Sequence, residues 1–217
     1  MTKIWITRTR PAADESAEAW RKAGFDLIVE PLLAIASVDH NPLPRETTVI
    51  FTSKNGVDHA SCAGQRAICV GDATASHARK AGYSDVVSVN GTSKDVARWV
   101  LANCPVSQPL CHVSGWHVRG TIVEDLSKAG YDAKRVEVYR SIPRPVWPEI
   151  QASLVALYSP LAAQVFAQLC RGASLSGLSA ICISQATARE LSGLQIKSIH
   201  IANHPREDEL IMAAKTV

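Results

Sequence analysis

Short loops rich in serine, threonine and glycine follow apolar runs along the chain, and these residue types suit the binding of anions. Each loop opens a helical stretch, so its backbone N–H groups and hydroxyls could bind a carboxylate. Helix capping is the alternative role for a serine or threonine at such a position. The loop residues that we expect to bind an anionic ligand are Thr7, Ser53, Asn55, Gly71, Thr74, Ser114, Gly115, Ser159, Pro160, Ser184 and Thr187.

Basic side chains accompany several of these loops. Arg8 and Arg10 directly follow the first apolar run, where an arginine can bind a carboxylate through two parallel hydrogen bonds. Lys54, Arg119 and Arg140 lie close to other loops. We expect Arg8, Arg10, Lys54 and Arg119 to bind the ligand, with a solvated surface charge as the alternative for each.

The sequence motifs of common enzyme classes are absent from the chain. It has no GxxxxGKS/T loop for a nucleoside triphosphate, no GxGxxG loop after a strand and no GxSxG nucleophile motif. His112 and His117 flank the Ser114 loop without further metal ligands nearby, so we interpret them as a core and a surface residue. The six cysteines include no CxxC pair. We therefore expect a protein that binds a polyanion without a metal or a cofactor.

The elements that position these loops are short strands alternating with helices. Apolar runs rich in β-branched residues predict ten strands, and the stretches between them have helical spacing. The expected strands are Ile4–Thr7, Leu27–Glu30, Val49–Thr52, Ala67–Val70, Val86–Val89, Leu110–Val113, Val136–Tyr139, Leu154–Tyr158, Ala180–Ile183 and Ile199–Ala202. This alternation predicts two five-stranded parallel sheets of the flavodoxin or Rossmann kind, each covered by helices on both faces.

An internal repeat divides the chain into two similar halves. The segment 67–75 (AICVGDATA) recurs at 180–188 (AICISQATA) with six identical positions. Lys22-Ala23-Gly24 recurs as Lys128-Ala129-Gly130, 106 residues later. Matching segments in one order favour a duplicated domain over chance.

Proline clusters suggest that the chain crosses between the two domains twice. Pro31, Pro42 and Pro44 lie at one junction, and further prolines follow at 143, 145 and 148. Proline-rich segments are extended and cannot continue a helix, so they suit linkers. We expect a discontinuous domain of residues 1–34 and 144–217, a contiguous domain of residues 38–139, and linkers at residues 31–48 and 138–148.

Composition limits the class of protein. A hydrophobic fraction of 47%, a charged fraction of 20% and a net charge of +3 are typical of a globular protein and indicate no nucleic-acid partner. No apolar run approaches the length of a membrane span, and the first residues lack the organisation of a signal peptide. We expect a cytoplasmic monomer.

The order and spacing of these segments resemble the uroporphyrinogen-III synthase family over the whole chain. The resemblance is carried by ITR at residues 6–8, PLL at 31–33, FTSKNGV at 51–57 and VGDATA at 70–75. Gly115, Arg119, Leu126 and Gly130 come next, followed by VYR at 138–140 and YSP at 158–160 with Ala162, Ala163 and Phe166. Residues 183–184, 187–188 and 202–205 complete it.

The resemblance implies two α/β domains joined by two extended strands, with the product cleft between them. It implies that hydroxymethylbilane loses water to give an azafulvene, which closes through a spiro intermediate to uroporphyrinogen III with ring D inverted. Haem, sirohaem or cobalamin formation would use this product, and hydroxymethylbilane synthase would be the partner that supplies the substrate. Because the substrate can also cyclise spontaneously without inversion, such an enzyme acts chiefly by positioning.

The family resemblance also suggests roles for single residues. Tyr139 matches a tyrosine beside the cleft and is the expected acid for hydroxyl departure, while Ser53, Thr74, Ser159, Ser184 and Thr187 match carboxylate-binding positions. Ser184 itself replaces a frequent glycine, and His204-Pro205-Arg206 replaces the usual Pro-Thr pairing. A non-enzymatic two-domain sensor of an anionic metabolite remains the alternative, since it would share the same loops.

Overall fold

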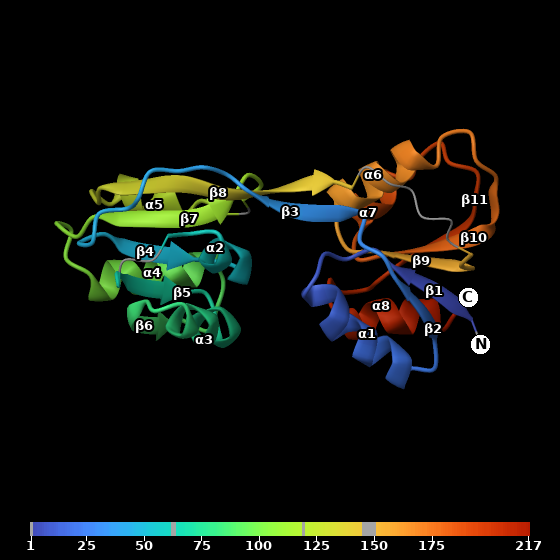
Figure 1. The fold of residues 1–217 in the computed structure, drawn as a ribbon, viewed down its shortest axis with the longest axis horizontal. Helices are drawn as coiled ribbons and strands as arrows, with labels where there is room; N and C mark the ends of the chain where they lie inside the picture. Colours follow the sequence, from blue (N-terminus) through green and yellow to red (C-terminus); the bar gives the residue numbers. More distant parts are fainter. Residues whose placement is uncertain (1, 62–63, 119, 145–150) are drawn as a thin grey trace. The chain divides into compact units, whose positions relative to one another are not determined.

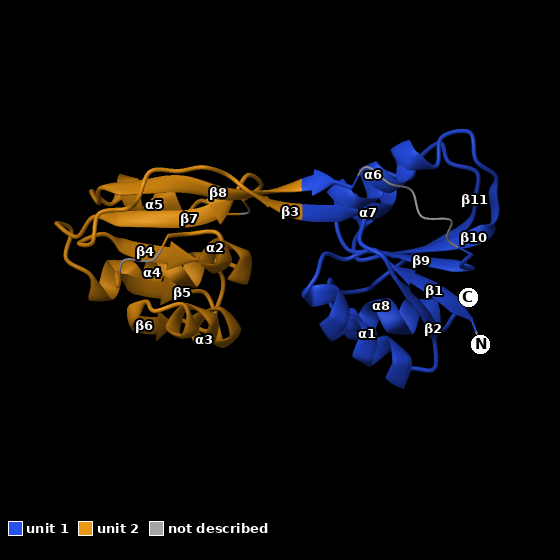
Figure 2. Cartoon of the chain, in the orientation of Figure 1, with its two compact units in different colours: residues 1–34, 142–217 blue, residues 35–141 orange. Residues whose placement is uncertain are grey.

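The computed structural model describes residues 2–61, 64–118, 120–144 and 151–217 (Figure 1). Contacts between Cα atoms divide the chain into two compact units. Unit 1 comprises residues 1–34 and 142–217, and unit 2 comprises residues 35–141 (Figure 2). Unit 1 is therefore built from both ends of the chain, as the fold class expected from the sequence requires.

The sheet of unit 1 has five parallel strands that are buried between two helical layers. In sheet order they are β11 (Ile196–Ile201), β10 (Leu175–Cys182), β9 (Leu154–Leu157), β1 (Lys3–Ile6) and β2 (Asp26–Val29). Its helices are α1 (Ala12–Lys22), α6 (Pro160–Leu169), α7 (Gln185–Arg189) and α8 (Glu207–Ala214). Trp20 of α1 packs on one face of the sheet and Phe166 of α6 on the other.

The sheet of unit 2 has six strands and the same layered construction. In sheet order they are β3 (Leu33–Ser37), β8 (Ala133–Pro143), β7 (Leu110–Gly115), β4 (Thr48–Phe51), β5 (Arg66–Cys69) and β6 (Ser84–Ser88). Its helices are α2 (Lys54–Asp58), α3 (Asp72–Lys80), α4 (Ser93–Asn103) and α5 (Ile122–Lys128). Helices α2 and α3 pack with Phe51 on one face, and α4 and α5 pack with Ile50 on the other.

The two sheets share one strand order, which agrees with the duplication. The order β2-β1-β9-β10-β11 of unit 1 corresponds to β8-β7-β4-β5-β6 of unit 2. Counted along the chain, unit 1 has the flavodoxin order 2-1-3-4-5, and unit 2 is a circular permutation of it. The repeated segments 67–75 and 180–188 form the equivalent β5–α3 and β10–α7 turns. The predicted fold class, with two parallel-sheet units of which one is discontinuous, is confirmed.

The prediction of two five-stranded sheets is wrong for unit 2, because β3 adds a sixth strand within the expected linker 31–48. β3 pairs with the long β8, and the amide of Arg144 donates to Leu32 while the amide of Val38 donates to Val138. Leu32 thus lies opposite Arg144, and Val38 lies opposite Val138. The residue numbers of β8 fall as those of β3 rise, so the two strands are antiparallel. Residues 145–148 of the second expected linker lie outside the described residues. The expected limits of independently folding domains stay predictions.

Glycines end three helices as the sequence predicts. Gly24, Gly82 and Gly130 have φ angles of +93°, +91° and +92°, in the left-handed region that glycine adopts without strain. No helix among the described residues is long and apolar enough to cross a membrane.

Candidate active site

The parallel strands of each unit end at one edge of its sheet, and most of the predicted ligand-binding residues lie there. In unit 1 this edge carries the loops after β1, β9 and β10, and in unit 2 it carries the loops after β4, β5 and β7. Ligands of open α/β sheets bind beyond the carboxyl ends of the strands, at the point where the strand order reverses. That point lies between β1 and β9 in unit 1 and between β7 and β4 in unit 2.

Tyr139 lies at the reversal point of unit 2. It pairs with Gly115 at the end of β7, after a shift in strand register. Its phenol oxygen lies 3.1 Å from the Oγ atom of Ser53, which follows β4. The structure thus brings together Tyr139, Ser53 and Gly115, three residues singled out from the sequence.

Gly115 allows the Tyr139 ring to lie directly against the backbone of β7. A Cβ atom built on Gly115 would lie 2.5 Å from the Cε2 atom of Tyr139 and 2.6 Å from its Cζ atom. Real Cβ atoms do not approach a ring that closely, so any larger residue would displace the tyrosine. The position of the phenol therefore depends on glycine at residue 115.

Replacement of Gly115 by alanine is expected to lower the rate of the reaction proposed below about tenfold, because a displaced catalytic group loses its alignment. Gly177→Ala is the control, since a Cβ atom there meets nothing within 4 Å. The measurement is kcat of both variants, with their melting temperatures to detect unfolding. Equal kcat for Gly115→Ala and the unmodified protein would show that the ring position is unimportant.

His59 lies beside Tyr139 and was missed by the sequence analysis. Its ring centroid is 5.8 Å from that of Tyr139, and its Nδ1 atom lies 2.8 Å from the Oγ atom of Ser37. Ser37 belongs to β3, the strand that the sequence analysis assigned to a linker. The sequence pattern marks His59 only weakly as a site residue, because His59 follows the short helix α2 and not a strand end.

Arg135 fixes the loop after β7 and was also missed. Its guanidinium donates to the Oγ atom of Ser114 at 3.0 Å and to the carbonyl oxygens of Gly115 and Trp116 at 2.6 Å each. These bonds hold the segment against which Tyr139 lies. Arg135 stands within β8, so nothing in the local sequence marks this role.

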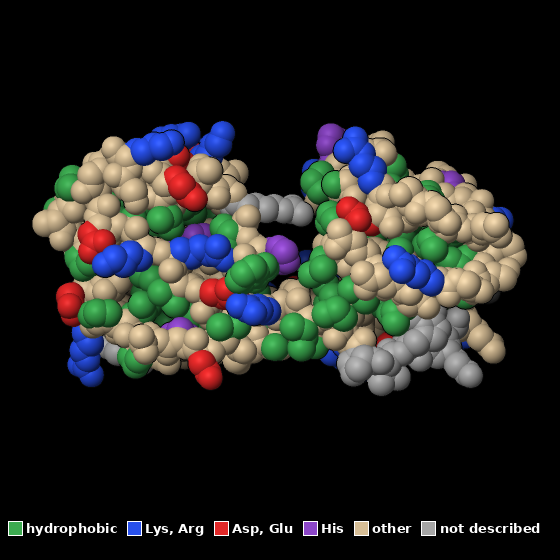
Figure 3. Space-filling view, turned by 90° about the horizontal axis from the view of Figure 1, so that it is seen from above, with side chains coloured by type: hydrophobic (Ala, Val, Ile, Leu, Met, Phe, Trp, Pro, Cys, Tyr) green, Lys and Arg blue, Asp and Glu red, His purple; other side chains and the backbone are tan. Residues whose placement is uncertain are grey.

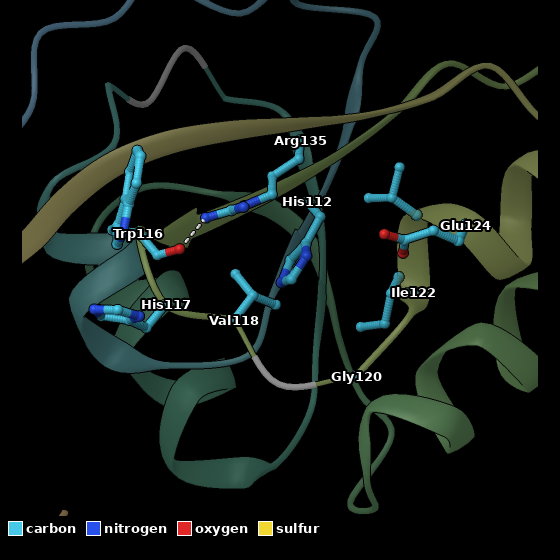
Figure 4. Close-up of a pocket in the computed structure, with 9 residues that line it drawn as sticks. His112, Trp116, His117, Val118, Gly120, Ile122, Glu124 and Arg135 are labelled. Atoms are coloured by element: carbon cyan, nitrogen blue, oxygen red, sulfur yellow. Dashed lines mark hydrogen bonds between the residues drawn. The ribbon is translucent and has the colours of Figure 1, made fainter. Parts of the chain in front are cut away.

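A cavity of about 350 Å³ opens beside this loop (Figure 4). Its wall carries one guanidinium group, two imidazole rings and one carboxylate, together with apolar side chains. Its lining residues are His112, Trp116, His117, Val118, Gly120, Ile122, Val123, Glu124 and Arg135.

His112 and His117 agree with their interpretation as a core and a surface residue. His112 is only 2% exposed, and its Nε2 atom lies 3.1 Å from the Thr52 hydroxyl, whereas His117 is exposed. Burial, helped by the charge of Arg135, lowers the pKa of His112 to about 4. His112 is therefore neutral at pH 7.

Helix capping, the alternative role for the loop hydroxyls, is what the structure shows for three serines. Ser53, Ser159 and Ser184 accept hydrogen bonds from the amides three residues later, at 3.2, 3.1 and 3.3 Å. Pro160 follows Ser159 in the first turn of α6, where its fixed φ suits a helix start. Each hydroxyl keeps a hydrogen and a second lone pair, so capping does not remove it from a ligand site.

The remaining hydroxyl and glycine positions differ in accessibility. Thr7, Thr74 and Thr187 are buried, and the Thr7 hydroxyl donates to the carbonyl oxygen of Ala156 at 2.6 Å. Gly71 has an extended backbone at the start of α3, with open space where a Cβ atom would lie. The Thr7 hydroxyl thus holds the loop after β1 against β9, and Gly71 leaves room for an incoming ligand.

Lys54 and Asn55 form the first turn of α2, and Arg119 lies outside the described residues. The Asn55 carbonyl accepts the amide of His59 at 3.2 Å. Arg10 forms an exposed ion pair with Asp14 at 2.7 Å. Both Arg10 and Lys54 remain predicted ligand contacts.

Arg8 is held by the protein itself rather than standing as a solvated charge. Its guanidinium bonds the Glu207 carboxylate at 3.2 Å and the Ser16 hydroxyl at 3.1 Å, and lies 5.3 Å from the centre of the Tyr158 ring. Glu207 also accepts from Tyr158 at 2.7 Å and from the Trp20 indole at 2.5 Å. Burial and the Glu207 charge raise the pKa of Tyr158, so its phenol stays protonated and donates to the carboxylate.

This cluster around Glu207 joins α8 to α1 and to the reversal point of unit 1. Arg8 and Glu207 are 199 residues apart in the chain, so no local pattern could reveal their pairing. The Glu207 carboxylate neutralises part of the charge of Arg8. The ion pair also holds the Arg8 guanidinium beside the loops after β1 and β9. The predicted ligand contact of Arg8 stays a prediction.

On the face shown in Figure 3, basic and acidic side chains are interspersed on unit 2, and the basic side chains of both units are scattered. Such a surface differs from the continuous basic stripe of a nucleic-acid-binding protein. Among the described residues, no three histidine, cysteine, aspartate or glutamate side chains gather as a possible metal site.

A family model described as uroporphyrinogen-III synthase HemD matches residues 14–212 of the chain. The chain belongs to the uroporphyrinogen-III synthase family. This is a family of hydro-lyases. Membership is decided by a match that covers most of the sequence, including the greater part of both segments of unit 1 and all of unit 2.

Solved structures of two family members are similar to this fold. Uroporphyrinogen-III synthetase from Helicobacter pylori aligns over 100% of this chain and 99% of its own, with 18% identity and a TM-score of 0.67. Uroporphyrinogen III synthase from Thermus thermophilus aligns over 100% and 99%, with 16% identity and a TM-score of 0.44. The likeness to the Helicobacter pylori structure supports the two-domain α/β fold. Comparison with curated protein sequences gives no significant match.

Proposed function

We propose that this chain is a uroporphyrinogen-III synthase, which dehydrates and cyclises hydroxymethylbilane with inversion of ring D. The observation that supports this most is the tyrosine site of unit 2, in a chain of this family. Tyr139 lies where the strand order reverses, 3.1 Å from Ser53 and directly against Gly115. It is the one phenol that the described residues place at that point of unit 2.

In this proposal Tyr139 donates its proton to the departing hydroxyl group. The C–O bond breaks as the pyrrole nitrogen supplies an electron pair, so water leaves. Loss of the proton from that nitrogen gives the azafulvene and restores the proton that Tyr139 donated. The substituted carbon of ring D then attacks the exposed methylene carbon to give a spiro intermediate. Fragmentation and reclosure with ring D inverted complete the macrocycle, and the net change is the loss of one water molecule.

The loops at the strand ends of both units supply the remaining contacts to the substrate. The proposed contacts are Thr7, Arg8, Arg10, Ser53, Lys54, Asn55, Gly71, Thr74, Ser114, Gly115, Arg119, Ser159, Pro160, Ser184 and Thr187. Backbone N–H groups at helix starts and fixed guanidinium groups suit a substrate with several carboxylates. Preorganised donors of this kind stabilise developing charge at little reorganisation cost.

We further propose that the protein works as a cytoplasmic monomer without a cofactor and receives its substrate from hydroxymethylbilane synthase. The product would enter haem, sirohaem or cobalamin formation.

The purified protein, given hydroxymethylbilane, is expected to yield uroporphyrinogen III rather than the uninverted isomer I. The products are oxidised to porphyrins and separated by chromatography, with a protein-free reaction as the control for spontaneous cyclisation. Isomer I alone would contradict the synthase function. Isomer I together with tight binding of a uroporphyrin would instead favour a non-enzymatic sensor.

A further inference from the structure

Trp116, directly after β7, is the most exposed aromatic side chain among the described residues, with 55% of its surface accessible. Exposure alone means little, because single apolar residues are common on protein surfaces. The distinguishing feature of Trp116 is its place at the strand reversal of unit 2, next to the site of Tyr139. Its local contacts indicate that the indole is presented to a ligand.

The main chain of Trp116 is held on both sides. Its amide donates to the carbonyl oxygen of Tyr139 at 3.0 Å, and its own carbonyl accepts from Arg135 at 2.6 Å (Figure 4). Fixed backbone on either side lowers the entropy lost when the side chain binds. The indole is therefore an exposed ring on a rigid support.

A guanidinium group lies over the indole. The Cζ atom of Arg140 is 4.5 Å from the centre of the Trp116 ring, within the range of a cation–π contact. The Nε atom of Arg140 donates to Glu137, and among the described residues this is the only hydrogen bond of the Arg140 side chain. The terminal N–H groups of Arg140 can therefore reach the carboxylate of a ligand.

The cavity of about 350 Å³ beside the loop has Trp116, His117 and Arg135 in its wall. This volume is within the usual range for small-molecule sites, which extends from about 300 to 1,000 Å³. The indole and the Arg140 guanidinium thus lie together, and Trp116 is also one of the residues that line the cavity. A planar ring that carries an acidic substituent fits the indole and the guanidinium.

We propose that Trp116 and Arg140 form a subsite for one pyrrole ring of the substrate. The ring stacks against the exposed part of the indole, and an acetate or propionate arm of the ring binds the terminal N–H groups of Arg140. The assignment of the pyrrole as a ring of hydroxymethylbilane rests on the proposed function. The stacking contact itself does not, so the two can be tested separately.

The direct test follows the indole N–H signals of the 15N-labelled protein by NMR during titration with a monopyrrole that carries one acetate and one propionate. The chain has five tryptophans, and the Trp116 signal is assigned as the one missing from Trp116→Phe. Trp99 of α4 is a matched control, because it also has a guanidinium over its ring: the Cζ atom of Arg66 lies 5.7 Å from the ring centre. Trp99 lies away from the strand ends. We expect the Trp116 signal to move and the Trp99 signal to stay.

The dimethyl ester of the same monopyrrole separates stacking from charge recognition. It should shift the Trp116 signal less than the free acid in the unmodified protein. In Arg140→Gln the acid and the ester should behave alike. An unmoved Trp116 signal at saturating monopyrrole, or equal shifts of Trp116 and Trp99, would overturn the subsite.

Kinetics provide the second readout. Trp116→Leu is expected to raise KM for hydroxymethylbilane roughly 3- to 10-fold, the effect of one aromatic contact, and to change kcat less than about twofold. Trp99→Leu should leave both constants unchanged. An unchanged KM for Trp116→Leu in an active enzyme would overturn the subsite, whereas an unmodified protein that forms only isomer I would overturn the synthase function and leave the NMR result standing.

Discussion

Tyr139→Phe is expected to lower kcat for uroporphyrinogen III formation about 100-fold or more, the usual contribution of a positioned general acid. The substitution removes the phenol oxygen that lies 3.1 Å from Ser53 and keeps the ring that fills the space against Gly115. Product binding should change little, because the ring and the surrounding loops remain. The expected result is therefore a loss of rate without a loss of affinity.

The measurement is kcat together with the affinity for the product, in Tyr139→Phe and in Tyr131→Phe as a matched control. Tyr131 also lies in unit 2, but its hydroxyl is buried and donates to the Cys104 carbonyl oxygen at 2.8 Å, away from the strand ends. Tyr131→Phe should cost about 1 kcal/mol of stability and leave kcat unchanged. Unchanged kinetics of Tyr139→Phe would contradict the acid role.

The pH dependence of kcat distinguishes a lost acid from a displaced one. If Tyr139 supplies the proton, the small residual activity of Tyr139→Phe should depend on solvent acid and rise as the pH falls. Gly115→Ala, which keeps the phenol but moves it, should retain the pH profile of the unmodified protein at a lower rate. Identical profiles for Tyr139→Phe and the unmodified protein would argue against proton donation.

The largest expected effect on stability comes from His112. Its pKa lies near 4 in the folded chain, against an ordinary value of 6.5, because the imidazolium ion would be buried beside Arg135. Between these two values the unfolded chain binds a proton that the folded chain excludes. His112 therefore stabilises the fold fully above pH 6.5, and this contribution is lost as the pH falls towards 4.

The loss amounts to about 3 kcal/mol between pH 7 and pH 4, from the difference between the two pKa values. Other groups also titrate in this range, so the informative quantity is the difference between the unmodified protein and His112→Gln. Glutamine can still hydrogen-bond Thr52 but does not titrate. Between pH 7 and pH 4, the free energy of unfolding of His112→Gln should fall by about 3 kcal/mol less than that of the unmodified protein.

Urea unfolding at several pH values between 7 and 4 provides the measurement. His117→Gln, which replaces an exposed histidine in the loop after β7, is the control and should follow the unmodified protein. Parallel pH curves for His112→Gln and the unmodified protein would show that His112 does not become more acidic on folding.

Local sequence patterns predicted the core elements of both units. Runs such as Val49–Phe51 and Leu154–Leu157 are continuous and apolar because both faces of a parallel strand are buried. The glycines at 24, 82 and 130 mark helix ends because only glycine adopts a positive φ at low cost. The repeat of segment 67–75 predicted equivalent turns, since similar sequences in similar contexts fold alike. These properties depend on neighbours within a few residues.

The strand β3 depended on tertiary structure. Leu33–Ser37 stands beside Pro31 in a region whose prolines suggest a linker. An extended segment becomes a strand only when a partner satisfies its backbone groups, and that partner is β8, about 100 residues later in the chain. A prediction from local pattern could identify the extended conformation but not the pairing.

The candidate site also has features that the sequence determines and features that only the tertiary structure determines. The sequence by itself determined which loops follow parallel strands, and hence that Ser53, Gly71 and Gly115 share one sheet edge in unit 2. Only the tertiary structure decided that Tyr139 meets Ser53, that Arg135 holds the Trp116 loop, and that Arg8 is paired with Glu207. The physical reason is that a side-chain contact depends on the packing of segments that are distant in sequence, whereas a strand end depends on a local pattern.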